Sequence, residues 1–383
     1  MDNFQDIKDA IHKLMEGFGE EYWMACDRDS RFPEEFRGAI VKSGWLGIAV
    51  PEAYGGSGLG LREGIVMMEA VANSPGAMSA ASSIHMDIFG PKSIVHHGSE
   101  TQKQEWLPQI ISGTLRTCFG VTEPDAGLDT GSITTSAHRD GDHYIIRGRK
   151  IWTSTAQQAD RVILLARTTP KEDCQKSTDG LSLFFAPLDR RYVTIQEIPK
   201  MGRHAVNSNM VFYDELPVPA SCLIGEEGQG FRILIDSLNP ERCLVAAEAI
   251  GIGRQALKRA CMYAREREVF GRPIGTNQSI QHPLAESYAE LEAAWLMTQK
   301  AADLYDQGLS CGIEANSAKY LAGEASFKAC ERAILTHGGM GYAKEYHVER
   351  LMREVWINRI APVSQQMVLN FIAERALGLP RSY

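Results

Sequence analysis

The chain has 383 residues, of which 44% are hydrophobic and 23% are charged, and its formal net charge is −8 at pH 7. This composition is close to that of an average soluble globular protein, so it excludes disorder, collagen and coiled coil as descriptions of the whole chain. The acidic balance and the lack of a basic stripe argue against nucleic-acid binding, and the length suggests two or three domains.

Targeting and redox features predict a cytoplasmic protein without a membrane span. Residues 1–6 are acidic and lack the apolar core of a signal peptide, and no run of about 18 apolar residues follows. The eight cysteines include no CxxC pair, so they are expected to be free thiols. The ten histidines show no HxxxH pair or other ligand spacing, so no metal site is expected.

The first third of the chain shows helical periodicity. Apolar residues recur every three or four positions between Ile7 and Met24, which predicts a helix there. Pro33 precedes two glutamates, a pattern in which proline lies just inside a helix start. Further helical patterns cover residues 66–72, 82–97 and 102–111.

Near residue 115 the period changes from helical to alternating, and after residue 225 it changes back. Five short β-branched and aromatic runs without intervening helices predict an antiparallel sandwich or barrel. They cover residues 143–147, 161–167, 181–185, 193–198 and 209–213. The later helical patterns are long, which predicts a bundle; they cover residues 243–267, 284–307 and 314–336. We therefore expect three domains: 1–115, 116–222 and 223–383.

Glycine motifs invite a nucleotide-binding interpretation but do not support a Rossmann site. Gly55–Gly60 does not have the GxGxxG spacing and follows no predicted strand, and Gly251–Gly253 lies inside a helical pattern. His337–Gly341 ends a long helical pattern. This last motif is either a helix C-cap or a place where a phosphate or ribityl chain approaches the backbone, and both readings stay open.

The order of the motifs resembles the acyl-CoA dehydrogenase family. The most specific is Val121–Gly127 (VTEPDAG), followed by Lys150–Ser154 (KIWTS), Gly228–Phe231, Arg267–Ile274 and His337–Gly341. The resemblance covers nearly the full chain. It implies an α+β fold, mainly α, with an N-terminal helical domain, a central antiparallel β-domain and a C-terminal four-helix bundle. It also implies FAD, an acyl-CoA substrate, a homotetramer and electron transfer to an electron-transferring flavoprotein.

The resemblance assigns a flavin site to the middle of the chain. By analogy with the family, Trp152 packs on the flavin face opposite the substrate and the Ser154 hydroxyl reaches N5. Thr122, with the backbone of Phe119 and Val121, would hold the pyrimidine edge. Read without the family, Trp152 is an ordinary strand aromatic.

Other matched positions imply that a second subunit completes the FAD site. Arg267 matches the arginine that reaches the pyrophosphate of FAD in a neighbouring subunit, a role that suits a permanent, forked cation. Alternatively, Arg267 is a solvated residue at the end of a helix. Six further positions match residues on the adenine side, at the turn that a second subunit approaches, or against FAD: Phe270, Gln278, Gly338, Gly339, Ser364 and Gln366.

The catalytic base is the main departure from the commonest family pattern. Many members carry their catalytic glutamate in a late motif, where this chain has Pro362. A branch that includes isovaleryl-CoA enzymes places it early, in an L-x-x-E-R context that matches Leu238–Arg242, so Glu241 is the candidate base. Asn239 matches a position that contacts the pantetheine arm, and Arg242 would orient the base or hold the substrate. Alternatively, Asn239, Pro240 and Glu241 form an ordinary helix start.

Pro362 raises a second question, because it lacks the backbone N–H with which the family commonly polarises the thioester oxygen. Either the local chain is shifted, or another group donates this hydrogen bond, or the reaction requires a different acidity of the substrate.

Two other functions remain open on the same fold. One is an acyl-CoA oxidase or flavin monooxygenase that uses dioxygen, and the other is a non-catalytic acyl-CoA- or flavin-binding scaffold. We expect Glu123, although it lies in the most specific motif, to be structural.

Overall fold

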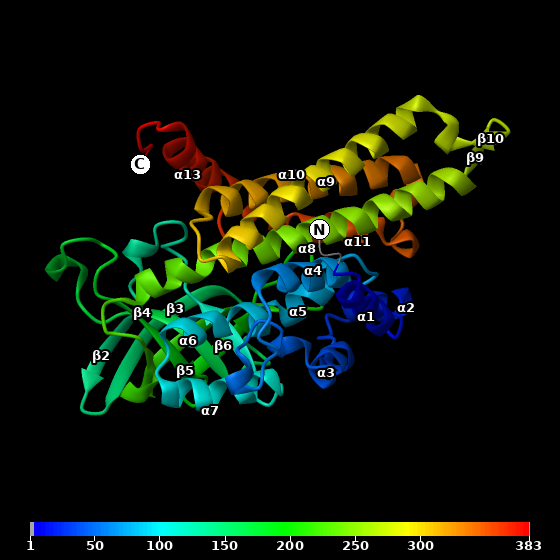
Figure 1. Cartoon of the computed structure of the whole chain (residues 1–383). Helices are drawn as coiled ribbons and strands as arrows, with labels where there is room; N and C mark the ends of the chain where they lie inside the picture. Colours follow the sequence, from blue (N-terminus) through cyan, green and yellow to red (C-terminus); the bar gives the residue numbers. More distant parts are fainter. Residues whose placement is uncertain (1–3, 383) are drawn as a thin grey trace.

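The computed structural model describes residues 4–382. Met1, Asp2 and Asn3, part of the stretch in which no signal peptide is expected, lie outside the described residues. The chain runs from short helices through a sheet to a second set of long helices (Figure 1). This order confirms the predicted α+β architecture, in which helices predominate.

Within the described residues, seven α-helices and two short 3₁₀-helices (Trp45–Gly47 and Glu52–Tyr54) precede the first strand. The α-helices are α1 (Gln5–Met15), α2 (Glu20–Arg28), α3 (Glu34–Lys42), α4 (Leu61–Ala72), α5 (Ala77–Phe89), α6 (Pro91–His97) and α7 (Glu100–Ile111). Two predicted helices are each divided. The helix expected over residues 7–24 breaks before Gly19, because glycine is a poor helix former. The helix expected over 82–97 breaks at Pro91, which begins α6 because proline cannot continue the ladder of hydrogen bonds. Pro33 is the N-cap of α3 rather than its first residue.

The central strands form one eight-stranded sheet. They are β1 (Thr117–Gly120), β2 (Ser136–Asp140), β3 (His143–Ser154), β4 (Arg161–Arg167), β5 (Leu181–Pro187), β6 (Val193–Glu197), β7 (Ser208–Pro219) and β8 (Leu223–Ile224). Their order is β6-β7-β3-β2-β4-β5-β8, with β1 paired to β4. Most pairs are antiparallel as predicted, but β2 pairs in parallel with β4 at Ser136 and Arg167, and β1 and β4 are parallel along their whole pairing. The hairpin of β2 and β3, which lies between them in sequence, supplies the long crossover that a parallel pair needs.

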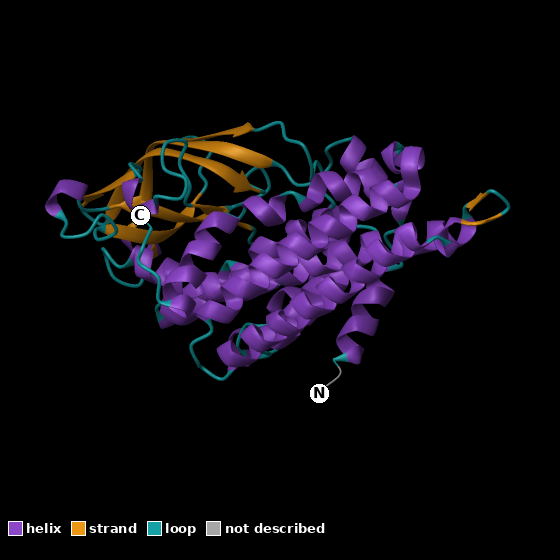
Figure 2. Cartoon of the chain, turned by 90° about the horizontal axis from the view of Figure 1, so that it is seen from above, coloured by secondary structure: helices purple, strands orange, loops and turns teal. Residues whose placement is uncertain are grey.

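Long helices form the last part of the chain: α8 (Gly230–Glu266), α9 (Gln278–Asp306), α10 (Gly312–His337), α11 (Val348–Val355), α12 (Ile357–Ile360) and α13 (Gln365–Leu377). Helix α8 begins well before Cys243, where the sequence pattern placed its start, because it continues through Pro240. A small hairpin of β9 (Glu268–Val269) and β10 (Arg272–Pro273) follows α8. It projects from the end of the bundle that lies farthest from the sheet (Figures 1 and 2).

Helix α8 connects the three parts of the fold. Its first turns pack against β5, its middle packs against α4 and α5, and its length packs against α9 and α10. Buried residues of α4, α5, α8 and α10 share one hydrophobic core, which includes Ile65, Ile84, Leu244 and Ala318. The crossing of α5 over α8 is therefore a fixed, buried position, and the candidate base lies on α8.

Two glycines mark the closest packing of α8. A Cβ atom at Gly251 would lie 2.6 Å from both the Ala72 Cβ and the Glu69 carbonyl oxygen of α4. A Cβ atom at Gly253 would lie 2.7 Å from a Leu291 methyl group of α9 and 3.0 Å from the Ser326 Cα of α10. These glycines allow α8 to touch helices on two sides.

Gly251→Ala is expected to lower the free energy of unfolding by about 1–3 kcal/mol, because the added methyl group overpacks the contact with α4. Gly38→Ala in α3 is the matched control, since nothing lies within 4 Å of the added Cβ there. That change should leave stability unchanged or raise it by up to about 1 kcal/mol. Urea unfolding of both variants checks this, and equal stabilities would contradict it.

Three properties of residues 4–382 bear on the kind of site the fold can hold. None of their helices has both the length and the apolar character that crossing a membrane requires. They contain no cluster of three or more His, Cys, Asp or Glu side chains that could hold a metal ion. Their eight cysteines are free thiols, and six of them are buried.

Candidate active site

Helix α8 carries Glu241 in its interior, directly after Pro240. The alternative in which Asn239, Pro240 and Glu241 begin a helix is therefore wrong, because the helix starts at Gly230. Proline in a helix interior removes one hydrogen bond of the ladder, which is a cost that a first-turn proline does not carry. A capping role does not explain the glutamate at this position.

The Glu241 carboxylate is buried and incompletely hydrogen-bonded. Its residue is 7% exposed, and its Oε2 atom has no hydrogen-bond partner. Burial raises the pKa of Glu241 to about 7, although the charges of His85, Arg242 and Lys319 oppose this rise. Buried polar atoms in proteins are nearly always paired, so an orphaned carboxylate oxygen indicates a position completed by a ligand. A carboxylate with a pKa near 7 is well suited to accept a proton at neutral pH.

Two further predicted residues lie beside Glu241 on α8. The Arg242 Nη1 atom donates to the Asn239 Oδ1 atom over 3.0 Å. The Arg242 Nε atom is buried without a partner, and burial lowers the pKa of Arg242. The structure thus brings Asn239, Glu241 and Arg242 together, with unpaired polar atoms on both charged groups.

A histidine of α5 faces the same position, and the sequence analysis did not identify it. The His85 Nε2 atom lies 4.0 Å from the Glu241 Oε1 atom, and the His85 Nδ1 atom lies 2.6 Å from the Glu248 Oε1 atom. Glu248 is buried on α8, two helical turns after Glu241. The seven-residue spacing of the two glutamates was a usable signal for a shared helix face, but nothing in the sequence pointed to His85.

The segment around Pro362 is held by a buried lysine. The Lys319 Nζ atom of α10 donates to the Val363 carbonyl oxygen over 2.6 Å, and Lys319 is 1% exposed. Burial lowers the pKa of Lys319 to about 8. Lys319 is therefore a second buried cation near Glu241, and sequence analysis did not single it out.

Trp152 occupies an irregular position in β3. The pairing of β3 with β7 shifts register between Lys150 and Thr153, and Trp152 has φ of +63°. Its side chain is 56% exposed. A left-handed conformation is a marked outlier for a bulky residue, and such outliers cluster at functional sites. Trp152 therefore lies in a strand, but its backbone conformation and its exposed ring are not those of an ordinary strand residue.

The loop after β1 lies against this irregular strand. The Ile151 N–H donates to the Thr122 carbonyl oxygen over 2.9 Å, which ties the loop to β3 beside Trp152. Phe119 and Val121 flank this contact and are half-buried. The structure therefore places Phe119, Val121 and Thr122 beside the end of β3 that carries Trp152 and Ser154.

Glu123 anchors the same loop from inside. Its carboxylate pairs with the buried Lys150 ammonium over 2.8 Å and accepts hydrogen bonds from Thr134 and Thr135. Burial alone would raise the pKa of Glu123, but Lys150 and these hydrogen bonds lower it to about 2. All of its contacts are structural, as the sequence analysis expects.

Aromatic rings connect the two groups of residues. The ring centroid of Phe119 lies 5.6 Å from that of Phe89 on α5, which lies 5.8 Å from the imidazole of His85. The ring of His85 in turn faces Glu241. The candidate flavin edge and the candidate base are therefore the two ends of one packed series of side chains.

The other predicted cofactor residues lie elsewhere. Arg267 ends α8, Phe270 lies at the tip of the β9–β10 hairpin and is 99% exposed, and Gln278 begins α9. Gly338 is the C-cap of α10 with φ of +59°, so the C-cap reading is confirmed. Gly339 follows it in open space.

Ser364 and Gln366 lie at the start of α13. The Ser364 hydroxyl caps this helix by accepting from the Met367 N–H, and Gln366 is exposed. Within one chain, the structure does not bring the hairpin tip at the end of the bundle to the sheet that carries Trp152 (Figure 1).

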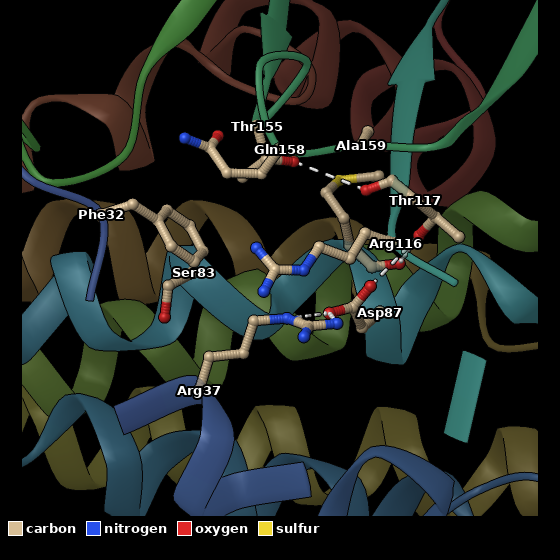
Figure 3. A pocket seen from close by; sticks show the side chains of 10 residues that line it. Phe32, Arg37, Ser83, Asp87, Arg116, Thr117, Thr155, Gln158 and Ala159 are labelled. Atoms are coloured by element: carbon tan, nitrogen blue, oxygen red, sulfur yellow. Dashed lines mark hydrogen bonds and ion pairs between the residues drawn. The ribbon is translucent and has the colours of Figure 1, made fainter. Parts of the chain in front are cut away.

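A small separate pocket lies between the first helices and the sheet (Figure 3). Arg37 of α3 pairs with Asp87 of α5 over 2.8 Å across it, and Thr117 donates to Asp87. Arg116 and Thr155 also line this pocket. The cavity measures about 10 Å³, the space of a single water molecule. Arg37 and Asp87 pair with each other, and Arg116 pairs with Glu34 outside the pocket, so these charges hold the junction of helices and sheet closed.

Three family models match consecutive parts of the chain. They are the N-terminal domain of acyl-CoA dehydrogenase over residues 1–114, the middle domain over residues 118–216 and the C-terminal domain over residues 228–377.

Individual relatives match over almost their whole length. Acyl-CoA dehydrogenase FadE12 of Mycobacterium tuberculosis is 39% identical, over 99% of this chain and 97% of the relative. The caffeyl-CoA reductase–Etf complex subunit CarC of Acetobacterium woodii is 33% identical, over 96% and 98%. The structure of butyryl-CoA dehydrogenase from Megasphaera elsdenii has a TM-score of 0.90 at 30% identity and covers 98% of both chains.

Proposed function

Because the chain belongs to the acyl-CoA dehydrogenase family of flavoprotein oxidoreductases, we propose that it converts an acyl-CoA thioester to the 2-enoyl-CoA with Glu241 as base. The observation that carries this proposal is the buried Glu241 carboxylate, whose Oε2 atom has no partner. Its pKa of about 7 suits a base that is ionised before it takes the α-proton. The residue at the commonest base position is Pro362, which cannot accept a proton.

The residues around Glu241 would bind and orient the thioester. Asn239 would contact the pantetheine arm, and Arg242, already held by Asn239, would keep the substrate or the base in place. Arg242 is suited to this role because its Nε atom is a buried donor without a partner. Neither residue would take part in the proton transfer itself.

The end of β3 that carries the exposed Trp152 would hold FAD, with Trp152 as the platform and Phe119, Val121, Thr122 and Ser154 as its neighbours. When bound, FAD supplies at N5 the acceptor for the β-hydride. The strained conformation of Trp152 supports this assignment, because it presents an aromatic face that the sheet itself does not use.

A homotetramer would complete each FAD site with residues from a neighbouring subunit. Arg267, Phe270 and Gln278 lie at the far tip of the bundle, so they would reach a partner rather than their own sheet. Gly338 and Gly339 offer open backbone at the same end of the bundle, where His337 stacks on Tyr263 of α8, and Ser364 and Gln366 would add polar contacts. Large exposed apolar side chains of the bundle and its hairpin support such an interface: Phe270, Tyr288, Leu296, Leu335, Tyr342 and Leu369.

The proposed electron acceptor is an electron-transferring flavoprotein. The relative from Acetobacterium woodii is a subunit of a complex with Etf.

We also propose that the chain has three domains, with boundaries at residues 115/116 and 222/223. Helices α1–α7, the sheet and helices α8–α13 follow these limits approximately.

The test is to mix the FAD-loaded protein anaerobically with straight, branched and cyclic acyl-CoA thioesters. We expect one class to bleach the oxidised flavin absorbance rapidly, and an electron-transferring flavoprotein to restore it. Bleaching by no thioester would contradict the proposal. Full turnover with dioxygen alone would instead establish an oxidase or monooxygenase, and thioester binding without bleaching would establish a scaffold.

A further inference from the structure

A buried histidine lies between two buried glutamates at the crossing of α5 and α8. His85 projects from α5, and Glu241 and Glu248 project from one face of α8. Their side chains are 12%, 9% and 3% exposed. The dehydrogenation described above uses only Glu241, so the His85–Glu248 pair has no assigned role.

Glu248 determines how the imidazole is oriented. The distance of 2.6 Å between Nδ1 and Oε1 is that of a strong hydrogen bond, and a carboxylate can only accept, so Nδ1 donates. This bond directs Nε2 toward Glu241. The packing of the ring against Phe89 supports the same orientation.

The distance between His85 and Glu241 is long enough to leave the base free. At 4.0 Å, Nε2 and Oε1 interact electrostatically but do not form a normal hydrogen bond. Glu241 therefore keeps an unpartnered oxygen for an incoming proton while a cation stays close.

The charged groups around this cluster come from each element packed against it. Glu241 is faced by His85 of α5, Arg242 and Glu248 of α8, and Lys319 of α10. His85 is faced by the two glutamates and by Arg203, whose Nη1 atom donates to Ser82 of α5. Burial would lower the pKa of His85, but the charges of Glu248 and Glu241 raise it above its ordinary value. The two carboxylates therefore favour the protonated form of the imidazole.

We propose that His85, oriented and kept protonated by Glu248, is a positioning residue that holds the base Glu241 in its ionised form. This inference rests on the proposed function of Glu241. The buried Glu248 carboxylate on the same face of α8 raises the pKa of Glu241, so without the charge of His85 a larger fraction of Glu241 would be protonated before the substrate arrived, although Arg242 and Lys319 still favour its ionised form. With His85 charged, the base is ionised, and the α-proton passes to Glu241 alone.

The test is the pH dependence of flavin reduction at low thioester concentration, which reports ionisation in the free enzyme. For the natural protein we expect the rate to fall as the pH drops through about 7. His85→Gln removes the cation, so the fall should move upward by roughly one pH unit. The rate at pH 6 should then be about tenfold lower than in the natural protein, while the rate at pH 9 stays within about twofold.

Glu248→Gln tests the link between the two residues. This change lets His85 lose its proton but also removes the negative charge of Glu248, and these effects on Glu241 oppose each other. We therefore expect only a small shift. Adding His85→Gln to Glu248→Gln should change little further, whereas additive shifts would show that Glu248 does not act through His85.

His97→Gln is the matched control, because His97 also pairs with a carboxylate of α8, Asp236, at 3.5 Å. It should leave the pH profile unchanged. The oxidised flavin spectrum reports folding of each variant, and His85→Asn replaces His85→Gln if that variant loses FAD. A uniform loss of rate at all pH values would overturn the proposal and leave His85 a structural role. Failure of the proposed function is distinct, because the natural protein would then show no flavin reduction at any pH.

Discussion

Glu241→Gln should lower the rate of substrate-driven flavin reduction by about 100- to 10,000-fold, the usual contribution of a general base. Glutamine has nearly the same shape but cannot take the α-proton. FAD and the thioester should still bind, because the amide keeps the side-chain volume in a site where burial already disfavours the charge. Anaerobic stopped-flow spectroscopy measures the loss.

Asp236→Asn is the control for this change. Asp236 lies earlier on the same helix and half of its side chain is exposed, so the variant alters charge on α8 without reaching the base. It should reduce flavin as fast as the natural protein. If Glu241→Gln also kept its rate, another group would be the base. If the natural protein and Glu241→Gln both bound the thioester without any change in the flavin spectrum, the scaffold interpretation would hold.

The second large effect is expected on stability. Glu123→Gln should lower the free energy of unfolding by about 3–5 kcal/mol, because it leaves the fully buried Lys150 ammonium without its counter-ion. The Glu123 carboxylate also accepts hydrogen bonds from Thr134 and Thr135. FAD should be lost in parallel, since Glu123 anchors the loop that carries Thr122. Urea unfolding and the flavin content after gel filtration check both results.

A double variant separates charge from packing. Adding Lys150→Met to Glu123→Gln should recover part of the stability, because no buried charge is then left unpaired. Asp125→Asn is the matched control, since Asp125 pairs with Arg149 in the same loop and strand but is 83% exposed. Exposed pairs contribute little. Equal losses for Asp125→Asn and Glu123→Gln would show that burial of the Lys150–Glu123 pair is unimportant.

The order of elements was predictable because each type of element has its own period in sequence. Helical spacing at the two ends and alternating runs in the middle identified the α, β, α order. The predicted helix boundaries were wrong where a single proline or glycine interrupted or obscured the helical pattern. Pro91 and Gly19 divided expected helices, and Pro240 concealed the first turns of α8 because proline usually marks a helix start.

The candidate base was predictable from a local motif, but its alternative could be removed only with the structure. The residues Asn239, Pro240 and Glu241 are consistent with a helix start as well as with a catalytic motif. The course of α8 from Gly230 decides between them. In the same way, an aromatic residue in a strand pattern does not show that Trp152 has φ of +63° and faces outward.

The sequence by itself determined the family, the position of the candidate base and the absence of a base at Pro362, because these depend on residue identity at fixed spacing. Only the tertiary structure decided what surrounds that base. His85 and Lys319 come from helices far from Glu241 in sequence, and their charges act on it only because α5, α8 and α10 pack together. A carboxyl group's proton affinity depends on burial and on charges within a few ångströms, and local sequence specifies neither.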